Sequence, residues 1–313
     1  MNPAESIREF LYLFVVKGGT SMPIISRREA IVKASAVAAS SVLASEARVF
    51  AETNQASRVV TKGRINQSVS RWPFDKIPFK DFCRAVAEMG LKAVDLLDMK
   101  DWETVKQFGL VCSMGYVQAG DITDGFNVKS NHDSIIRNLE KGIPQAAKAG
   151  VPNVITFFGN RRNMGDAEAI ENCVAGLNRI KKVAEDHGVT ICVELLNSKV
   201  DHKDYQGDHT PFGVQVVKAV GSPRVKLLYD IYHMQIMEGD IIRTIRENYQ
   251  WIGHYHTGGI PGRHEIDSSQ ELNYAAVCTA IAATGYKGYV AHEFIPTKDP
   301  LTSLREAARL CDV

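Results

Sequence analysis

Four short apolar segments of the chain each end in a residue that can bind a divalent metal ion. These residues are Glu194, Asp230, His256 and Glu293. They are separated by 36, 26 and 37 residues, each interval matching one strand, one helix and two loops. Because an unpaired charge beside apolar residues is costly to bury, we expect the four side chains to share one site. The alternatives are solvated loop positions and, for Asp230, a helix cap.

Three carboxylates and one imidazole make a ligand set that consists mainly of oxygen. Such a set favours Mg²⁺ or Mn²⁺, with Co²⁺ as a further option, over thiolate-bound Zn²⁺. A metal ion of this kind polarises a carbonyl group, so that the neighbouring C–H proton can leave. Two carboxylates can then exchange the roles of general base and general acid, and we expect Glu194 and Glu293 to be this pair.

The elements that must position these residues alternate between strands and helices. Eight strands are predicted, at residues 64–71, 93–97, 111–116, 153–158, 190–196, 225–232, 252–256 and 289–294. Helical periodicity lies between them, for example at 135–149 and 167–187. Glycines mark the expected helix ends, at Gly90, Gly150, Gly188 and Gly285. This pattern predicts an α/β fold, a (β/α)8 TIM barrel with its chemistry at the carboxyl ends of the strands.

An open, doubly wound sheet is the alternative fold. It would need a glycine-rich phosphate loop after the first strand, and Arg71-Trp72-Pro73-Phe74 stands there instead. We expect Trp72 and Phe74 to form an apolar wall against a substrate or to close the barrel top.

Composition points to one large core and a small-molecule partner. Of the 313 residues, 45% are hydrophobic and 23% charged, and the net charge is +1. Without residues 1–51 the chain has 31 Lys and Arg against 32 Asp and Glu. This balance argues against nucleic acid or an anionic membrane as a partner. The six cysteines show no C-x-x-C spacing, so we expect reduced, buried thiols.

The first fifty residues differ from the rest. Paired arginines, Arg27 and Arg28, precede a weakly apolar run at 34–44 and small residues at Ala47 and Ala51. This order predicts a twin-arginine signal and export to the periplasm or its equivalent. The expected division is an over-extended start at 1–21, the signal at 22–51, a linker at 52–63 and the barrel at 64–313. The apolar run at 10–16 is too short for a stable membrane span.

Several motifs together resemble the hydroxypyruvate isomerase family of the xylose isomerase-like barrel superfamily. They are Glu194-Leu195-Leu196-Asn197, Asp230-Ile231-Tyr232-His233, Gly253-His254-Tyr255-His256, Pro261-Gly262-Arg263-His264-Glu265, Asn273-Tyr274 and His292-Glu293-Phe294. The resemblance implies that Glu194, Asp230, His256 and Glu293 bind the metal and that the two glutamates move protons. It also implies that His233 and Arg263 hold oxygens of a small hydroxycarbonyl or sugar substrate. Whether the chain forms a homo-oligomer is left open.

Two departures from the family pattern keep the substrate open. Bacterial hydroxypyruvate isomerases tend to have Gln where His256 stands, whereas the related ketose 3-epimerases have His. The further Glu of the epimerases is missing from residues 197–200, and residues 261–267 follow the isomerase pattern. The leading hypothesis is a metal-dependent isomerase that interconverts aldose-type and ketose-type hydroxycarbonyl compounds, as the family it resembles converts hydroxypyruvate to tartronate semialdehyde. A 3-epimerase is the alternative, followed by a non-catalytic sugar-binding barrel or a nuclease-like relative, which would need more ligands and a basic face.

Other polar residues have weaker assignments. We expect His254 and His292 to pack behind the ligands and to point differently from them. The polar loop at 198–210, with His202 and His209, is either a mobile cover over the site or a plain solvated loop. For Arg263 the alternative is a surface salt bridge.

Replacement of both Arg27 and Arg28 by lysine is expected to retain the precursor inside the cell, because the signal depends on the paired arginines. The unaltered chain should yield mature protein, beginning near Glu52, outside the cytoplasm. Immunoblotting of cell fractions measures both forms. Normal export of the double variant would exclude this pathway.

Overall fold

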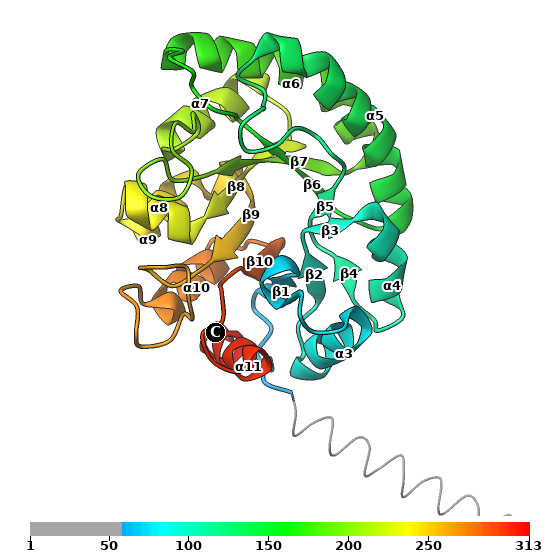
Figure 1. The fold of residues 1–313 in the computed structure, drawn as a ribbon, viewed down its shortest axis with the longest axis vertical. Coiled ribbons are helices and arrows are strands. Elements are labelled where there is room, and N and C mark those ends of the chain that lie inside the picture. The colour runs from blue at the N-terminus through cyan, green and yellow to red at the C-terminus, as the bar shows by residue number, and fades with distance from the viewer. Residues whose placement is uncertain (1–57) are drawn as a thin grey trace, which may run out of the picture. The chain divides into compact units, whose positions relative to one another are not determined.

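A computed structural model describes residues 58–313, which form a ring of parallel strands surrounded by helices (Figure 1). The expected start at 1–21 and export signal at 22–51 lie outside the described residues. The strands are β1 (Asn66–Ser70), β2 (Ala93–Asp95), β3 (Leu97–Asp98), β4 (Val111–Cys112), β5 (Gly115–Tyr116), β6 (Asn153–Phe157), β7 (Thr190–Leu195), β8 (Val225–Asp230), β9 (Ile252–Thr257) and β10 (Tyr289–His292).

The strand order confirms the predicted eight-stranded barrel. Ten strand segments run in the order β3-β5-β6-β7-β8-β9-β10-β1-β2-β4. β2 and β3 are parts of one strand, separated at Leu96, whose φ of 53° interrupts the extended backbone. β4 and β5 likewise share one strand. Because β2 pairs with β4 and β3 pairs with β5, which in turn pairs with β6, the ring is closed.

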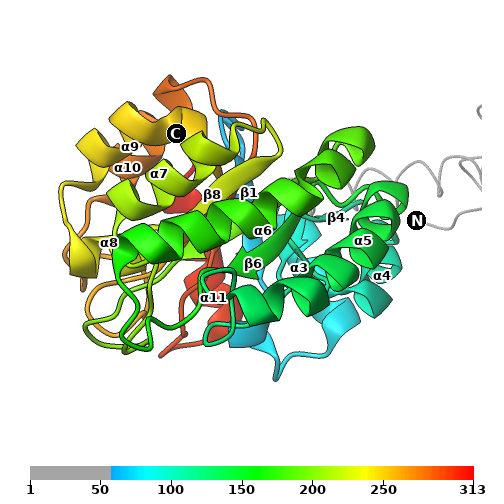
Figure 2. The same ribbon diagram turned by 90° about the horizontal axis from the view of Figure 1, so that it is seen from above.

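Helices cover the outside of the ring, and α5, α6 and α7 run side by side there (Figure 2). The helices are α3 (Phe79–Met89), α4 (Trp102–Lys106), α5 (His132–Ala149), α6 (Asp166–His187), α7 (Thr210–Val220), α8 (Ile231–Met237), α9 (Ile241–Asn248), α10 (Tyr274–Ala283) and α11 (Pro300–Leu310). As predicted, α3, α5 and α6 end at Gly90, Gly150 and Gly188, all in the left-handed conformation.

Two strands, β8 and β10, end two residues earlier than the sequence predicted, and both ends lie at the candidate site. β8 stops at Asp230, because this side chain accepts a hydrogen bond from the His233 N–H and begins α8. β10 stops at His292, so Glu293 is the first residue beyond the strand. Both carboxylates therefore stand where the strands give way to loops or helices.

The core of the barrel is apolar and contains all six cysteines as buried free thiols, as expected. No helix within residues 58–313 has the length and apolar character needed to cross a membrane.

The barrel extends to residue 58, so part of the expected linker at 52–63 packs against it. The N–H groups of Val59 and Val60 donate to the Met89 carbonyl. Asp312 accepts hydrogen bonds from the backbone N–H groups of residues 61, 62 and 63. These contacts join both ends of the described chain at the bottom of the barrel.

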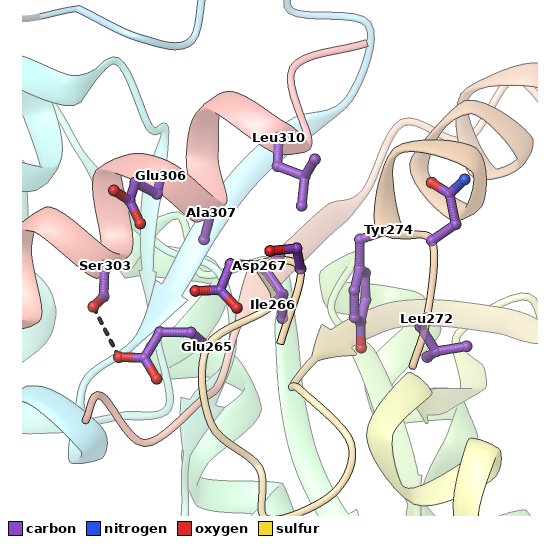
Figure 3. A pocket seen from close by; sticks show the side chains of 11 residues that line it. Glu265, Ile266, Asp267, Leu272, Tyr274, Ser303, Glu306, Ala307 and Leu310 are labelled. Atoms are coloured by element: carbon purple, nitrogen blue, oxygen red, sulfur yellow. Dashed lines mark hydrogen bonds between the residues drawn. The ribbon is translucent and has the colours of Figure 1, made fainter. Parts of the chain in front are cut away.

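Glu265 anchors the loop after β9, which carries Arg263, to the start of α11. Its carboxylate accepts from the Thr297 N–H at 2.7 Å, the Thr297 hydroxyl at 2.8 Å and the Ser303 hydroxyl at 2.9 Å. Figure 3 shows the last bond at the edge of a cavity of about 420 Å³ between this loop and α11. Burial disfavours the charged form, but the donors, the Thr297 N–H foremost, lower the pKa of Glu265 to about 2.

Glu265→Gln is expected to lower the free energy of unfolding by about 1–3 kcal/mol at neutral pH, because the donors lose a charged acceptor. The depressed pKa means that this contribution is complete above the unfolded pKa of about 4.3 and is lost as the pH falls towards 2. Urea unfolding of the full chain at several pH values measures the difference. Glu306→Gln, at an exposed position beside the same cavity, is the control and should change stability by less than about 0.5 kcal/mol.

Candidate active site

The four predicted metal ligands converge at the carboxyl end of the barrel. Each offers one ligand atom, and these atoms all lie within 4.8 Å of one another. Glu194 lies on β7, Asp230 at the end of β8, His256 on β9 and Glu293 directly after β10. All four are buried, and Glu194 is the most accessible at 6% exposure. The spacing in the sequence therefore identified residues that the fold brings together.

A bulge in β9 places His256 beside Asp230. The register pairs Leu227 with Ile252 but Leu228 with His254, so Gly253 is an extra residue in β9. Without the bulge, Asp230 would lie opposite Tyr255, and His256 would face the other side of the sheet. A Cβ at Gly253 would lie 2.8 Å from the Lys226 Cβ, so the bulge requires glycine at this position.

The environment of His256 Nδ1 fits a cation. This nitrogen lies against Glu293 Oε2, 3.6 Å from Glu194 Oε1 and 3.7 Å from Asp230 Oδ2. It has no hydrogen-bond partner among the described residues, although it is fully buried. A nitrogen lone pair that faces three carboxylates is the arrangement of a metal ligand set.

Asp95, at the end of β2, fixes the orientation of His256 and was missed in the sequence. The His256 Nε2–H donates to Asp95 Oδ2 at 2.9 Å, which leaves Nδ1 as the nitrogen that faces the carboxylates. The Ser113 hydroxyl donates to Asp95 Oδ1 at 2.5 Å. Asp95 is fully buried, and His254 and His256 beside it hold its pKa below the usual range in spite of burial. Asp95 lies within the predicted strand at 93–97 and not at its end, so the pattern of strand ends did not identify it.

The two other histidines near the ligands pack behind them. His292 Nε2 lies 2.8 Å from Gln67 Oε1, and its Nδ1 lies 3.2 Å from Thr257 Oγ1. His254 was expected to point differently from His256, and this was wrong. Its Nε2 lies 3.1 Å from Asp95 Oδ1, because residues two apart on a strand share a face.

Arg263 and His233 complete the polar part of the site. The Arg263 Nη2 lies 2.7 Å from both Asp230 Oδ2 and Glu293 Oε2. Its Nη1 lies 2.5 Å from His233 Nε2. The Arg263 side chain is 13% exposed, so the alternative of a surface salt bridge is wrong.

The electrostatics of the site follow from burial and from these neighbours. Burial raises the pKa of Glu194 to about 7. Burial also acts on Asp230 and Glu293, but Arg263 and His256 outweigh it and lower the pKa of both. Burial disfavours charge on His256, yet Glu293 and the other carboxylates raise its pKa well above the usual value. The surrounding carboxylates therefore favour a positive charge beside His256 Nδ1, which either a proton or a metal ion can supply.

A cavity of about 510 Å³ opens onto the cluster, and Glu194, His233, Arg263 and Glu293 reach it. Trp72 lines the cavity and donates from Nε1 to Glu293 Oε1 at 2.5 Å. Trp72 is thus the expected wall.

Phe74 was the second residue expected at the wall, and the loop at 198–210 was expected either to cover the site or to be solvated. Phe74 packs against Phe82 and Phe294 and closes the barrel. Asp201 and His202 of the loop line the cavity. His209 pairs with Asp208 away from it, with its side chain 49% exposed.

A family model described as xylose isomerase-like TIM barrel matches residues 83–312. The chain belongs to the xylose isomerase-like TIM barrel family. This confirms the superfamily that the motifs resembled.

Two relatives with similar sequences carry the names of isomerases. A Danio rerio protein that carries hydroxypyruvate isomerase as a provisional name is 26% identical over 242 residues, covering 72% of this chain and 87% of the relative. A 2-oxo-tetronate isomerase from Cupriavidus necator is 33% identical over 130 residues, covering 42% of this chain and 48% of that protein. A crystal structure from Brucella melitensis, described as an AP endonuclease of family 2, has a TM-score of 0.69 at 25% identity and covers 77% of this chain and 97% of its own.

Asp95→Asn is expected to weaken Mn²⁺ binding by about 10- to 100-fold, because the carboxylate behind a ligating imidazole sets its tautomer and basicity. Calorimetric titration of the chelator-treated full chain measures the affinity. The matched control is Asp98→Asn, which alters an exposed side chain at the end of β3 and should leave the affinity unchanged. Equal affinities for Asp95→Asn and the unaltered chain would show that Asp95 does not support the ligand.

Proposed function

We propose that the chain is a metal-dependent isomerase that interconverts aldose-type and ketose-type hydroxycarbonyl compounds, such as hydroxypyruvate and tartronate semialdehyde. The observation that carries the proposal is the convergence of three carboxylates on a buried imidazole nitrogen that has no hydrogen-bond partner within residues 58–313. The names of the relatives, hydroxypyruvate isomerase and 2-oxo-tetronate isomerase, support the type of substrate.

Glu194, Asp230, His256 and Glu293 would hold one divalent ion, through Nδ1 of the imidazole and an oxygen of each acid. Mg²⁺ or Mn²⁺ suits this donor set, and Co²⁺ is a further option. When bound, the ion polarises the substrate carbonyl and lowers the energy needed to remove the adjacent C–H proton.

The two glutamates are the proposed acid and base. Glu194 and Glu293 come from β7 and from the end of β10, with β8 and β9 between them, so they flank the site. One carboxylate takes the proton from carbon, which gives an enediolate of the substrate. Return of a proton to the neighbouring carbon, together with transfer of the hydroxyl proton from one substrate oxygen to the other, completes the isomerisation. Return of the proton to the same carbon on its other face gives an epimer. The same residues could therefore serve a ketose 3-epimerase, and the products decide between the two.

Arg263 and His233 are proposed to bind the substrate. The guanidinium offers parallel donors to a carboxylate such as that of hydroxypyruvate. A nuclease is disfavoured, because residues 52–313 have 31 basic against 32 acidic side chains and thus lack the excess of positive charge that binds nucleic acid.

The test is to incubate the full chain in D₂O with a panel of hydroxycarbonyl compounds, after chelation and after reloading with Mn²⁺ or Mg²⁺. We expect turnover only with metal, and deuterium at the carbon that receives the proton, because the carboxylates exchange with solvent. NMR of the products separates isomers from epimers. Complete retention of the substrate hydrogen would indicate a hydride shift and remove both glutamates from the role of base.

Variants of three of the four ligands extend the same assay. Glu194→Gln and Glu293→Gln should each abolish turnover, because each removes an acid–base group as well as a ligand. His256→Gln should retain metal binding, because glutamine stands at this position in bacterial isomerases that the chain resembles.

A further inference from the structure

Asn197 is a fully buried amide behind His233, and its orientation is fixed. Its side-chain Oδ1 accepts hydrogen bonds from the N–H groups of Val200 at 3.0 Å and Asp201 at 2.9 Å. Turning the amide over would aim its NH₂ group at these two donors and its oxygen at the Asp201 carboxylate. The hydrogen-bond network therefore places Nδ2 on the side of His233.

The amide nitrogen determines which nitrogen of His233 carries a hydrogen. Asn197 Nδ2 lies 2.6 Å from Asp201 Oδ2 and 2.6 Å from His233 Nδ1. An amide nitrogen only donates, so His233 Nδ1 must accept. A neutral imidazole has one acceptor and one N–H, so the hydrogen is on Nε2. A protonated ring would place a second donor against the amide.

The Nε2–H of His233 has no acceptor among residues 58–313. Arg263 Nη1 lies 2.5 Å from Nε2 and has only hydrogens to offer, so it could donate to Nε2 only in the other tautomer. That tautomer would leave the Asn197 amide nitrogen facing an Nδ1–H. The nearest carboxylate oxygen, Asp230 Oδ2, is 3.8 Å away. His233 is fully buried, yet it lines the cavity above the carboxylate cluster. A buried donor of this kind needs an acceptor, which a ligand in the cavity can supply.

We propose that Asn197 is a positioning residue that holds His233 as the Nε2–H tautomer, so that His233 donates to the substrate oxygen that gains negative charge as the C–H proton leaves. This rests on the proposed isomerase function. Asp201 supports the arrangement, because its Oδ2 accepts from Asn197 and from the Tyr232 hydroxyl at 2.9 Å. Arg263 yields its place beside Nε2 to the substrate oxygen, since two donors cannot share one hydrogen bond.

A donor aimed at a developing oxyanion acts mainly on the transition state. Removing one such donor typically costs about 10²- to 10³-fold in kcat. The same contact to a neutral carbonyl or hydroxyl is weaker, so KM depends on it less. An acceptor at Nε2 would instead repel the oxygen.

The test is the exchange variant Asn197→Asp with Asp201→Asn, which conserves net charge and shape. The new carboxylate at 197 keeps its two backbone donors, accepts from the new amide at 201, and accepts from His233 only if Nδ1 carries the hydrogen. The exchange therefore reverses the tautomer. Tyr232 can accept from the second N–H of the new amide, so the network stays satisfied. Asp201→Asn alone is the matched control, because Asn197 still donates to Nδ1.

Two measurements on the full chain decide the outcome. In ¹⁵N-histidine NMR, with the His233 signal identified by its loss in His233→Gln, we expect Nε2–H in the unaltered chain and in Asp201→Asn, and Nδ1–H in the exchange variant. In the isomerase assay, kcat of the exchange variant should fall about 100-fold with little change in KM, and Asp201→Asn should lose at least tenfold less.

An Nδ1–H signal in the unaltered chain would overturn the proposal, even if the exchange variant does not fold. So would an exchange variant with a reversed tautomer and full kcat. If the unaltered chain turns over none of the substrates, the proposed isomerase function fails, while the NMR result still shows whether Asn197 sets the tautomer.

Discussion

The concentration of buried negative charge at one end of the barrel is the constraint on which the rest of the site depends. Glu194, Asp230, Glu293 and Asp95 are all at most 6% exposed, and burial of unpaired carboxylates is strongly unfavourable. Arg263 bonds to two of them at 2.7 Å, and His256 lies among all four. The loops above the barrel must therefore deliver positive charge to this point. A divalent ion would meet the same demand.

The barrel meets this constraint through the geometry of strands β8 and β9 and of the loop after β9. The β9 bulge at Gly253 turns His256 towards Asp230, and the early end of β8 makes Asp230 both a helix cap and a member of the cluster. Glu265 ties the loop of Arg263 to the start of α11. Together they bring one ligand atom from each of the four clustered residues to within 4.8 Å of the others.

The sequence predicted the barrel and the four clustered residues because both depend on period and position. Strands recur at regular intervals, and a charged residue at the end of an apolar run stands out. It did not predict Asp95, because no local feature distinguishes this aspartate from a solvated one until His256 is placed beside it. It did not predict the bulge or the Asn197 network either, since both depend on contacts between segments far apart in sequence.

The two imidazoles that face the cluster have opposite polarity, and each is fixed from behind. Asp95 accepts from His256 Nε2, so His256 presents a lone pair at Nδ1 to the carboxylates. Asn197 donates to His233 Nδ1, so His233 presents an N–H at Nε2. A lone pair suits a cation and an N–H suits an oxygen that becomes negative. Neither imidazole could exchange roles with the other, because a carboxylate stands behind one and an amide behind the other. The chemistry of the site is thus determined by residues that the substrate does not touch.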